Sequence, residues 1–328
     1  MREPPERVAA GRVRDVIIVG SGPAGYTAAI YSARAGLDTV VVEGERPGGA
    51  LMTAGQVDNY PGVAPLVGGP ALAAAMRDQA QQFGAELKAG IVHRFDLHGE
   101  PKAVAVRDVA VRDEVCHARA LILAMGSVNR PLDVPGERKL IGRGLSASAK
   151  LDGDQFAGRE VAVIGGGDAA VEEALYLVPR VRRVTLVHRR PQLRASAIAV
   201  ARLRTRPNVT ILTSTEVLAV CGEHYVTGLR LRDMQSAAEY EIGVAATFVA
   251  VGQMPRSDLL RGRIDLDAQG YIRIRDGTNH TSVDGVFAAG DLIDRRYRQA
   301  ITAAATGCAA ALDAHRWITD TRWPAAAC

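Results

Sequence analysis

Short runs of apolar residues alternate along this chain with longer stretches in which alanine and polar residues are mixed. The first run, residues 15–19, is rich in β-branched residues and leads directly into a glycine-rich turn. An alanine-rich stretch from Tyr26 to Gly36 has the composition of a helix, and a second apolar run covers Thr39 to Val42. The pattern predicts strand, turn, helix and strand, the βαβ unit from which parallel sheets are built.

The same pattern returns in the second half of the chain. It predicts a strand over residues 161–164, a helix over 168–178 and a strand over 184–187. Two such units in one chain predict two dinucleotide sites.

Each unit carries the glycine motif of a dinucleotide site. The first glycine of the motif permits a tight turn, the second lets a pyrophosphate approach the backbone, and the third position lets the helix pack closely on the strand. The helix N-terminus then offers unpaired N–H groups and a positive dipole end to the phosphates. The motif residues are Gly20, Gly22 and Gly25 in the first unit and Gly165, Gly167 and Ala170 in the second.

The two units differ at the residue that ends their second strand, which lies 23 positions after the first glycine in both. Glu43 can accept hydrogen bonds from ribose hydroxyls and would repel a 2′-phosphate. His188, Arg189, Arg190 and Arg194 instead offer a guanidinium cluster that suits a 2′-phosphate. We therefore expect FAD in the first unit and NADPH in the second; the alternative is that these arginines form a solvated face.

A later apolar segment ends in Gly290-Asp291, which could bind a polar part of FAD or could be an ordinary turn. Residues 121–126 and 247–252 are predicted to be strands that cross between two domains. We expect an α/β fold with two Rossmann-like (GxGxxG) domains, the NADPH domain being inserted in a split FAD domain. The predicted boundaries give the FAD domain residues 1–128 and 257–328, and the NADPH domain residues 129–256.

Composition agrees with a two-domain globular protein. The chain has 328 residues, 48% of them hydrophobic and 23% charged, and no apolar run is long enough to span a bilayer. A net charge of +4 without a recognition motif argues against nucleic acid as a partner. The four cysteines show neither CxxC nor metal-ligand spacing, so we expect no metal. With no secretory signal, the scattered thiols favour a cytoplasmic location.

Several long segments resemble the low-molecular-weight thioredoxin reductase family. They include GSGPAGYTAAIYSARAGL (20–37), VIGGGDAAVEEALYL (163–177), HRRPQLRAS (188–196) and RYRQAITAAATGCAAALDA (296–314). The resemblance covers nearly the whole chain. It implies a homodimer that holds FAD and NADPH, with a domain rotation that presents the nicotinamide and a redox dithiol to the flavin in turn.

Motif and resemblance together give the expected cofactor-binding residues. For FAD they are Gly20, Ser21, Gly22, Pro23, Ala24, Glu43, Gly44, Gly49, Ala50, Asn59, Gly126, Gly290, Asp291, Arg298, Gln299 and Ala300. For NADPH they are Gly165, Gly167, Asp168, Ala169, Ala170, His188, Arg189, Arg190 and Arg194.

The chain departs from the family pattern at one place. Where the family has Cys-Ala-Thr-Cys-Asp-Gly, residues 148–153 read Ser-Ala-Lys-Leu-Asp-Gly. Disulfide reduction needs one thiolate to attack and a second to resolve the mixed disulfide, and neither Ser148 nor Leu151 can do this. We therefore expect no dithiol relay through this segment. The terminal Cys328 is an alternative thiol.

Asp152 and Lys150 are the candidate catalytic residues of this segment. Asp152 could donate a proton to a substrate, or it could simply cap a turn. Lys150 could contact an anionic substrate or a partner protein, or it could be an ordinary solvated lysine.

The favoured function is an FAD-dependent NADPH oxidoreductase that passes electrons to an acceptor other than thioredoxin. That acceptor would be a small molecule or a small electron-carrier protein. One alternative reverses the flow, so that a flavin-dependent oxidase or dehydrogenase tailors a small, secondary-metabolite substrate. The other is a non-catalytic flavin-binding module.

Overall fold

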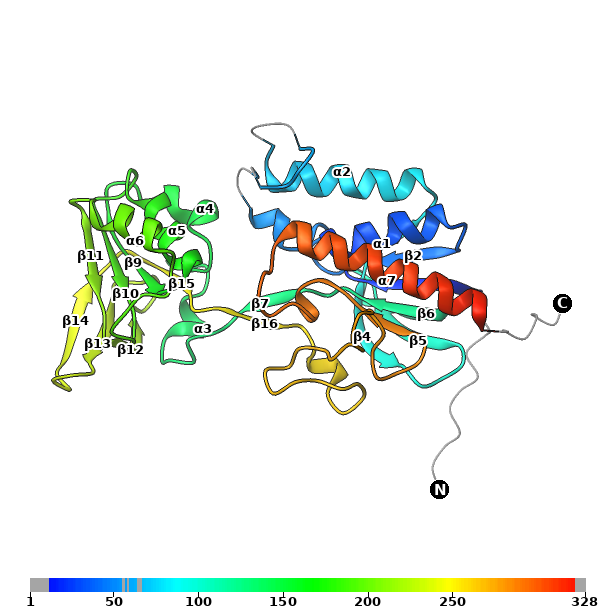
Figure 1. Ribbon diagram of the computed structural model, residues 1–328. Helices are drawn as coiled ribbons and strands as arrows, with labels where there is room; N and C mark the ends of the chain where they lie inside the picture. Colours follow the sequence, from blue (N-terminus) through cyan, green and yellow to red (C-terminus); the bar gives the residue numbers. More distant parts are fainter. Residues whose placement is uncertain (1–11, 55–56, 58, 64–66, 322–328) are drawn as a thin grey trace, which may run out of the picture. The chain divides into compact units, whose positions relative to one another are not determined.

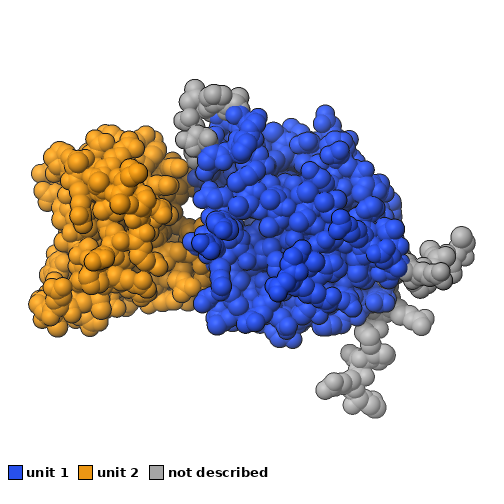
Figure 2. All heavy atoms as spheres, viewed as in Figure 1, with its two compact units in different colours: residues 1–127, 255–328 blue, residues 128–254 orange. Residues whose placement is uncertain are grey.

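The chain is divided into two compact units, shown in Figure 2. The computed structural model describes residues 12–54, 57, 59–63 and 67–321. Unit 1 consists of Met1–Ser127 and Pro255–Cys328, and unit 2 of Val128–Met254. The chain passes between the units through two short strands, β7 (Ser127–Asn129) and β16 (Gln253–Pro255), which pair with each other.

The expectation that residues 121–126 and 247–252 form the crossing strands is wrong. Leu121–Leu123 are completely buried and belong to a strand in the middle of the unit 1 sheet. Residues 247–250 belong to a strand of the unit 2 sheet. Both apolar runs are core strands that end a few residues before the crossings.

Unit 1 is built around a sheet with the strand order β3-β2-β1-β6-β5-β4. β17 pairs with the C-terminal part of β6, on the side opposite β1. The β1, β2, β3, β6 and β17 strands run parallel, and β4 and β5 form an antiparallel extension. The strands are β1 (Val13–Val19), β2 (Thr39–Val42), β3 (Glu86–Lys88), β4 (Ile91–Asp96), β5 (Lys102–Arg107), β6 (Asp113–Leu123) and β17 (Val286–Ala288). The helices are α1 (Pro23–Arg34), α2 (Gly69–Gln82) and α7 (Ala300–Asp320), with short 3₁₀ turns at Gly49–Thr53, Asp258–Leu260 and Gly290–Leu292.

Alternation of side chains along β1 gives unit 1 two apolar cores. Val16 and Ile18 face a layer of small residues from α1 and α7, which lie next to each other in Figure 1. Ile17 and Val19 face the opposite side, where they pack with residues of β4, β5 and the segment 260–292. The many alanines of α1 and α7 let the two helices lie close together against the sheet.

Unit 2 repeats this plan on a smaller scale. Its parallel sheet has the order β11-β10-β9-β15-β8, and a separate antiparallel sheet has the order β12-β13-β14. The parallel strands are β8 (Leu145–Ser146), β9 (Glu160–Gly165), β10 (Arg183–Val187), β11 (Val209–Leu212) and β15 (Ala246–Ala250). The antiparallel strands are β12 (Thr215–Cys221), β13 (Gly228–Asp233) and β14 (Glu239–Gly243). The helices are α3 (Glu137–Leu140), α4 (Ala149–Asp152), α5 (Asp168–Leu177) and α6 (Ala197–Arg204), with a 3₁₀ turn at Gly153–Phe156.

The faces of β9 also alternate. Val161 and Val163 pack beneath α5 and α6, whereas Ala162 and Ile164 pack against the antiparallel sheet. The α/β fold with two parallel, Rossmann-like sheets is confirmed. Within the described part of the chain, no helix is both long enough and apolar enough to cross a membrane.

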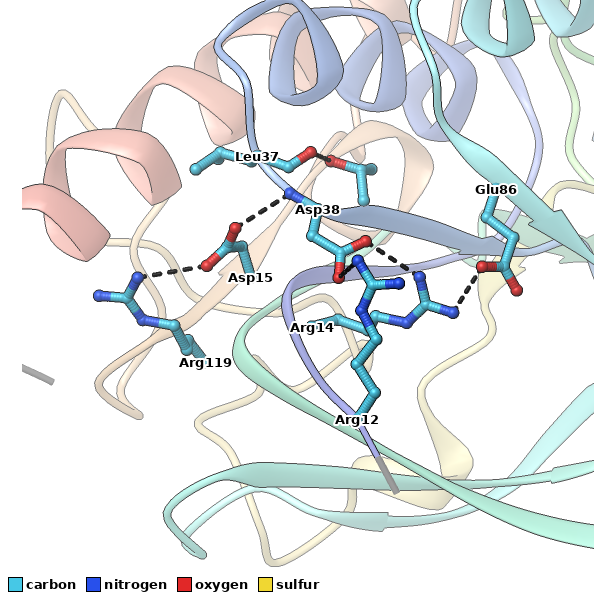
Figure 3. Close-up of polar contacts among 8 residues, drawn as sticks. Arg12, Arg14, Asp15, Leu37, Asp38, Glu86 and Arg119 are labelled. Carbon is cyan, nitrogen blue, oxygen red and sulfur yellow. Dashed lines mark hydrogen bonds and ion pairs between the residues drawn. The ribbon is translucent and has the colours of Figure 1, made fainter. Parts of the chain in front are cut away.

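Charged residues gather at the amino ends of β1 and β2, away from the glycine turn (Figure 3). Asp15 accepts a hydrogen bond from the Asp38 N–H at 3.0 Å and from Arg119 at 3.2 Å. The Arg14 guanidinium forms ion pairs with Asp38, at 2.9 Å, and with Glu86. These contacts tie β1 to the neighbouring β2, β3 and β6 at the edge of the sheet that carries no glycine motif.

Replacing Asp15 tests how much this cluster stabilises unit 1. Asp15→Asn weakens one backbone and one guanidinium contact, and we expect the free energy of unfolding to fall by about 1 kcal/mol, since the carboxylate is partly exposed. Urea denaturation measures the change. Asp78→Asn, on the exposed face of α2, is the matched control. Equal stabilities of the two variants would show that the cluster does not stabilise the fold.

Candidate functional site

The glycine turn after β1 is fixed by contacts within the chain at two of its three positions. Gly20 has a φ of +110°, and a Cβ there would come within 2.2 Å of the Ala124 carbonyl oxygen. A Cβ at Gly25 would lie 1.9 Å from the Gly20 carbonyl oxygen. These glycines therefore allow α1 to start directly against the end of β1.

Gly22 is different, because nothing in the chain requires a glycine there. Its φ of −74° is ordinary, and a Cβ would meet no atom within 4 Å. No side chain caps the N-terminus of α1 at this point, so its first N–H groups face the open space, apart from Pro23, which has none. This open, electropositive position fits a pyrophosphate.

A second loop closes one side of the turn. Gly49 approaches Gly22 so closely that a Cβ on Gly49 would be 3.0 Å from the Gly22 Cα. The Ser21 hydroxyl donates to the Glu43 carbonyl at 2.6 Å and accepts from the Gly48 N–H at 3.3 Å. Ser21 and Gly49 thus lie against the glycine turn at Gly22, whereas the Gly44 N–H donates to the Gly90 carbonyl. Ala50 directly follows Gly49 in the 3₁₀ turn Gly49–Thr53.

Glu43 directly follows β2, and its side chain is only 3% exposed. Its Oε1 accepts hydrogen bonds from the Tyr26 hydroxyl and from Arg77 Nε, both at 2.8 Å, and its Oε2 accepts from Arg77 Nη2 at 3.1 Å. Burial and the bond to Glu43 raise the pKa of Tyr26. A carboxylate with these partners retains acceptor capacity on Oε2 for a ribose hydroxyl.

The Gly-Asp segment meets the same end of α1. A Cβ on Gly290 would lie 2.9 Å from the Ala24 Cβ, so Gly290 packs against the start of this helix. Asp291 accepts a hydrogen bond from the Ser127 hydroxyl at 2.8 Å, and Ser127 directly follows Gly126. Burial raises the pKa of Asp291. The carboxyl is therefore held at the edge of unit 1 where β6 and β17 end.

The start of α7 lies just beyond Asp291. Gln299 caps this helix, and its side-chain oxygen accepts from Asn59 Nδ2 at 3.3 Å. The preceding backbone turns at Arg298, which has a φ of +51° and donates its N–H to Asp294. Arg298, Gln299 and Ala300 thus present a helix N-terminus, which suits an electron-rich group.

In the glycine turn of unit 2, too, one glycine is required by close contacts and another faces open space. Gly165 has a φ of +149°, and a Cβ there would lie 2.3 Å from the Ala250 carbonyl oxygen and 2.8 Å from the Ala170 Cβ. Gly167 has a φ of −95°, and a Cβ would meet nothing within 4 Å. Asp168 and Ala169 then begin α5. The Asp168 carboxylate accepts the Ser196 N–H at 2.8 Å.

His188 covers this turn, because its ring would lie 2.4 Å from a Cβ on Gly166. The following loop is tied to the turn by the Arg194 N–H, which donates to the Gly166 carbonyl at 2.6 Å. The His188 Nε2 atom is buried and has no hydrogen-bond partner. Burial lowers the pKa of His188, and Arg194 acts in the same direction.

Arg189, Arg190 and Arg194 are exposed. Within the described ranges they form no ion pair. An unpartnered acceptor and three unneutralised guanidinium groups beside an open glycine turn fit a nucleotide that carries a 2′-phosphate.

The segment 148–153 forms the short helix α4 and the turn that follows it. Asp152 accepts from the Ser146 hydroxyl at 2.5 Å and from the Gln155 amide at 3.5 Å, so its carboxylate fastens this turn to β8. The Ala149 N–H donates to the Glu173 carboxylate of α5. Lys150 and Leu151 are exposed, Leu151 by 52%. Asp152 also stands at the N-cap position of the 3₁₀ turn Gly153–Phe156, where its side chain forms no capping hydrogen bond.

The described cysteines, Cys116, Cys221 and Cys308, are free thiols. Burial raises the pKa of Cys116 to about 11, which suppresses its thiolate. Cys328 lies outside the described residues. No group of three or more metal-ligating side chains occurs in the part of the chain that is described.

Four contributing residues were not identified from the sequence: Tyr26, Arg77, Ser127 and Glu173. Arg77 follows Glu43 by 34 positions, and Glu173 follows Ala149 by 24. No motif spacing marks such pairs, because the folded arrangement of helices brings them together. Tyr26 could have been found, since it lies in the first turn of α1 directly after the glycine motif.

Two nucleotide-binding folds in one chain, each with a glycine turn and a charged residue after the second strand, define a two-nucleotide oxidoreductase. The family model of pyridine nucleotide-disulphide oxidoreductases matches residues 14–307, and the chain belongs to this family. It is 51% identical over 308 residues to a thioredoxin reductase of Mycolicibacterium smegmatis, covering 94% of this chain and 97% of that one. A thioredoxin reductase of Streptomyces clavuligerus is 47% identical over 307 residues, with coverages of 93% and 94%.

Among solved structures, the thioredoxin reductase of Lactococcus lactis matches with a TM-score of 0.86 and 33% identity. The match covers 94% of this chain and all of that one. FAD and NADPH are the cofactors of the thioredoxin reductases, which confirms the cofactors expected from the two glycine motifs. The chain is therefore an oxidoreductase and a flavoprotein of this type.

The middle glycines provide a test of the two sites. Gly22→Ala and Gly167→Ala add a methyl group in open space, so we expect each to leave the fold stable and to weaken one nucleotide by about tenfold or more. Gly22→Ala would affect FAD retention, and Gly167→Ala the KM for NADPH. Gly25→Ala, which collides with backbone, is the contrasting variant and should reduce soluble protein. The assignment fails if Gly22→Ala retains FAD as the unmodified protein does.

The carboxyl that caps α4 provides a test of pH dependence. Burial raises the pKa of Glu173, so the folded protein binds this proton more tightly than the unfolded chain does. The free energy of unfolding therefore decreases as the pH rises from the ordinary carboxyl pKa, about 4.3, to the raised value in the folded protein.

Glu173→Gln should remove this decrease while its amide oxygen still accepts the Ala149 N–H. Chemical denaturation between pH 4 and 8, on the order of one measurement per pH unit, checks this. Glu172→Gln, on the exposed side of the same helix, is the control. Parallel stability curves for Glu173→Gln and the unmodified protein would contradict the prediction.

Proposed function

We propose that this protein transfers electrons from NADPH to FAD and then to an acceptor other than thioredoxin. One observation carries the proposal. The segment at which the resembling family has its two cysteines reads Ser148-Ala-Lys-Leu151, while both nucleotide sites retain their glycine turns and charged residues. A hydroxyl and an isobutyl group can neither attack a disulfide nor resolve one.

In this proposal the two units have separate tasks. Unit 1 would hold FAD through Gly22, Glu43, Asp291 and the start of α7. Unit 2 would hold NADPH through Gly167, with Arg189, Arg190 and Arg194 available for the 2′-phosphate. When bound, NADPH would supply a hydride and FAD would accept it.

The chain's own groups bind and orient the two nucleotides. The N-termini of α1 and α5 each place about half a positive unit charge at a pyrophosphate. The neutral imidazole of His188 can accept a hydrogen bond through Nε2 without adding a fourth positive charge to the arginine cluster. Such a site favours the phosphorylated nucleotide over NADH by charge.

The acceptor is proposed to be a small molecule or a small electron-carrier protein. The α4 turn, fixed by Ser146, Asp152 and Glu173, presents Lys150 and Leu151 outward, and a dithiol would otherwise occupy this position. Lys150 could contact an anionic acceptor. We further propose that the protein is a cytoplasmic homodimer, as the resemblance implies.

An anaerobic titration with NADPH tests the first half of the proposal. We expect the oxidised-flavin absorbance to bleach with about one equivalent of NADPH, because the flavin takes up two electrons as one hydride. A flavin that stays oxidised would overturn the reductase function. Bleaching by a substrate without NADPH would favour the oxidase alternative.

A thioredoxin assay tests the second half. We expect negligible NADPH-dependent reduction of thioredoxin by the unmodified protein, with NADPH oxidation supported by quinones or small carriers. The double variant Ser148→Cys and Leu151→Cys restores two thiols at the family's spacing and is the matched control. Thioredoxin reduction by the unmodified chain at the rate of this variant would contradict the proposed acceptor.

A further inference from the structure

Arg77 lies on α2, outside both glycine motifs and outside the four segments quoted above for the family resemblance. Its guanidinium nonetheless forms a two-point contact with Glu43, with Nε at 2.8 Å from Oε1 and Nη2 at 3.1 Å from Oε2. The Tyr26 hydroxyl adds a third donor at 2.8 Å from Oε1. Three elements, β2, α1 and α2, thus meet at one carboxylate.

The contact with Arg77 offsets the cost of burying the Glu43 carboxylate. The Glu43 side chain is 3% exposed, and a buried carboxylate is costly unless charged or hydrogen-bonding groups compensate it. Arg77 supplies the compensating charge and remains 38% exposed, so its other N–H groups stay hydrated. The planar two-point geometry also fixes the direction of the carboxylate, which a lysine could not do.

The arrangement leaves one oxygen available. A carboxylate can accept about four hydrogen bonds, two on each oxygen. The described donors occupy two on Oε1 and one on Oε2. The remaining acceptor position is therefore on Oε2, at the carboxyl end of β2, the same edge of the sheet at which the glycine turn follows β1.

The Arg77–Glu43 ion pair differs from another ion pair of unit 1 in where it lies along the strands of the sheet. Arg107 and Asp113 form an equally short two-point contact, at 2.8 and 3.0 Å, but both are about half exposed. Asp113 begins β6, and β6 runs parallel to β1, so this pair lies at the amino edge of the parallel strands. The Arg77–Glu43 pair lies at the opposite edge, where α/β sheets bind ligands.

We propose that Arg77 is a positioning residue for FAD, which orients Glu43 so that Oε2 accepts a hydrogen bond from the adenosine ribose. The inference rests on the proposed function, because it requires FAD in unit 1. It gives α2 a role in binding the adenosine ribose, which neither glycine motif contacts. Arg77 acts through Glu43.

The test compares release of bound nucleotide from the full-length protein as purified. Arg77→Met removes the charge and the planar fork, Arg77→Lys keeps the charge, and Arg107→Met is the control at the other edge of the sheet. Release of FAD after dilution is followed by the rise in flavin fluorescence. The same proteins are loaded with an FAD analogue whose adenosine ribose lacks both hydroxyls.

We expect Arg77→Met to release FAD about tenfold to a hundredfold faster than the unmodified protein. Arg77→Lys should lie between the two, and Arg107→Met should release FAD at the unmodified rate. Removing the ribose hydroxyls should speed release from the unmodified protein by a similar factor. It should have little further effect in Arg77→Met, because the oriented acceptor is already lost.

Two results would overturn the inference. One is an unchanged FAD release rate in Arg77→Met. The other is that the two changes act independently, so that the increase in release rate in Arg77→Met with the analogue equals the product of the two separate increases. That would mean that Arg77 stabilises unit 1 without orienting Glu43. If Arg77→Met does not yield folded protein, the same comparison is made with Arg77→Lys. An unmodified protein that binds no FAD would instead refute the proposed function itself.

Discussion

The close approach of a helix to the end of a strand is the constraint on which both nucleotide sites depend. In unit 1 a single Cβ on Gly25 would lie 1.9 Å from the Gly20 carbonyl oxygen, so α1 can begin where it does only without that atom. In unit 2 the corresponding close approach is between Gly165, where a Cβ would lie 2.8 Å from the Ala170 Cβ, and the start of α5. The helix N-terminus is thereby held at the edge of each sheet, where its unpaired N–H groups face the open position at Gly22 or Gly167.

Around this shared geometry the two units differ in charge. Unit 1 places one buried carboxylate at the end of β2 and compensates it with Arg77 and Tyr26. Unit 2 places a neutral histidine at the end of β10 and leaves three exposed arginines beside it. One backbone design thus carries a carboxylate after the second strand of unit 1 and an exposed arginine cluster beyond the second strand of unit 2.

The segment 148–153 takes its local structure from only some of its side chains. The turn is fixed by Ser146, Asp152 and Glu173, and none of these contacts involves positions 148 or 151 through their side chains. Side chains at those two positions can therefore change without loss of the local structure. The high similarity to thioredoxin reductases establishes the family and the cofactors, whereas the acceptor that we propose rests on the side chains at this one turn.

The sequence by itself determined the two βαβ units, their glycine turns and the contrast between Glu43 in unit 1 and the arginines that follow His188 in unit 2. These features depend on residues close together in the chain, so local spacing was enough to predict them. It misplaced the crossing strands, because an apolar run does not reveal whether a strand lies in a core or between domains. Only the tertiary structure decided that Arg77 pairs with Glu43 and that Glu173 accepts the first N–H of α4. Each of these pairs joins residues that are far apart in sequence, and packing of helices against sheets, rather than any local pattern, brings their charges into contact.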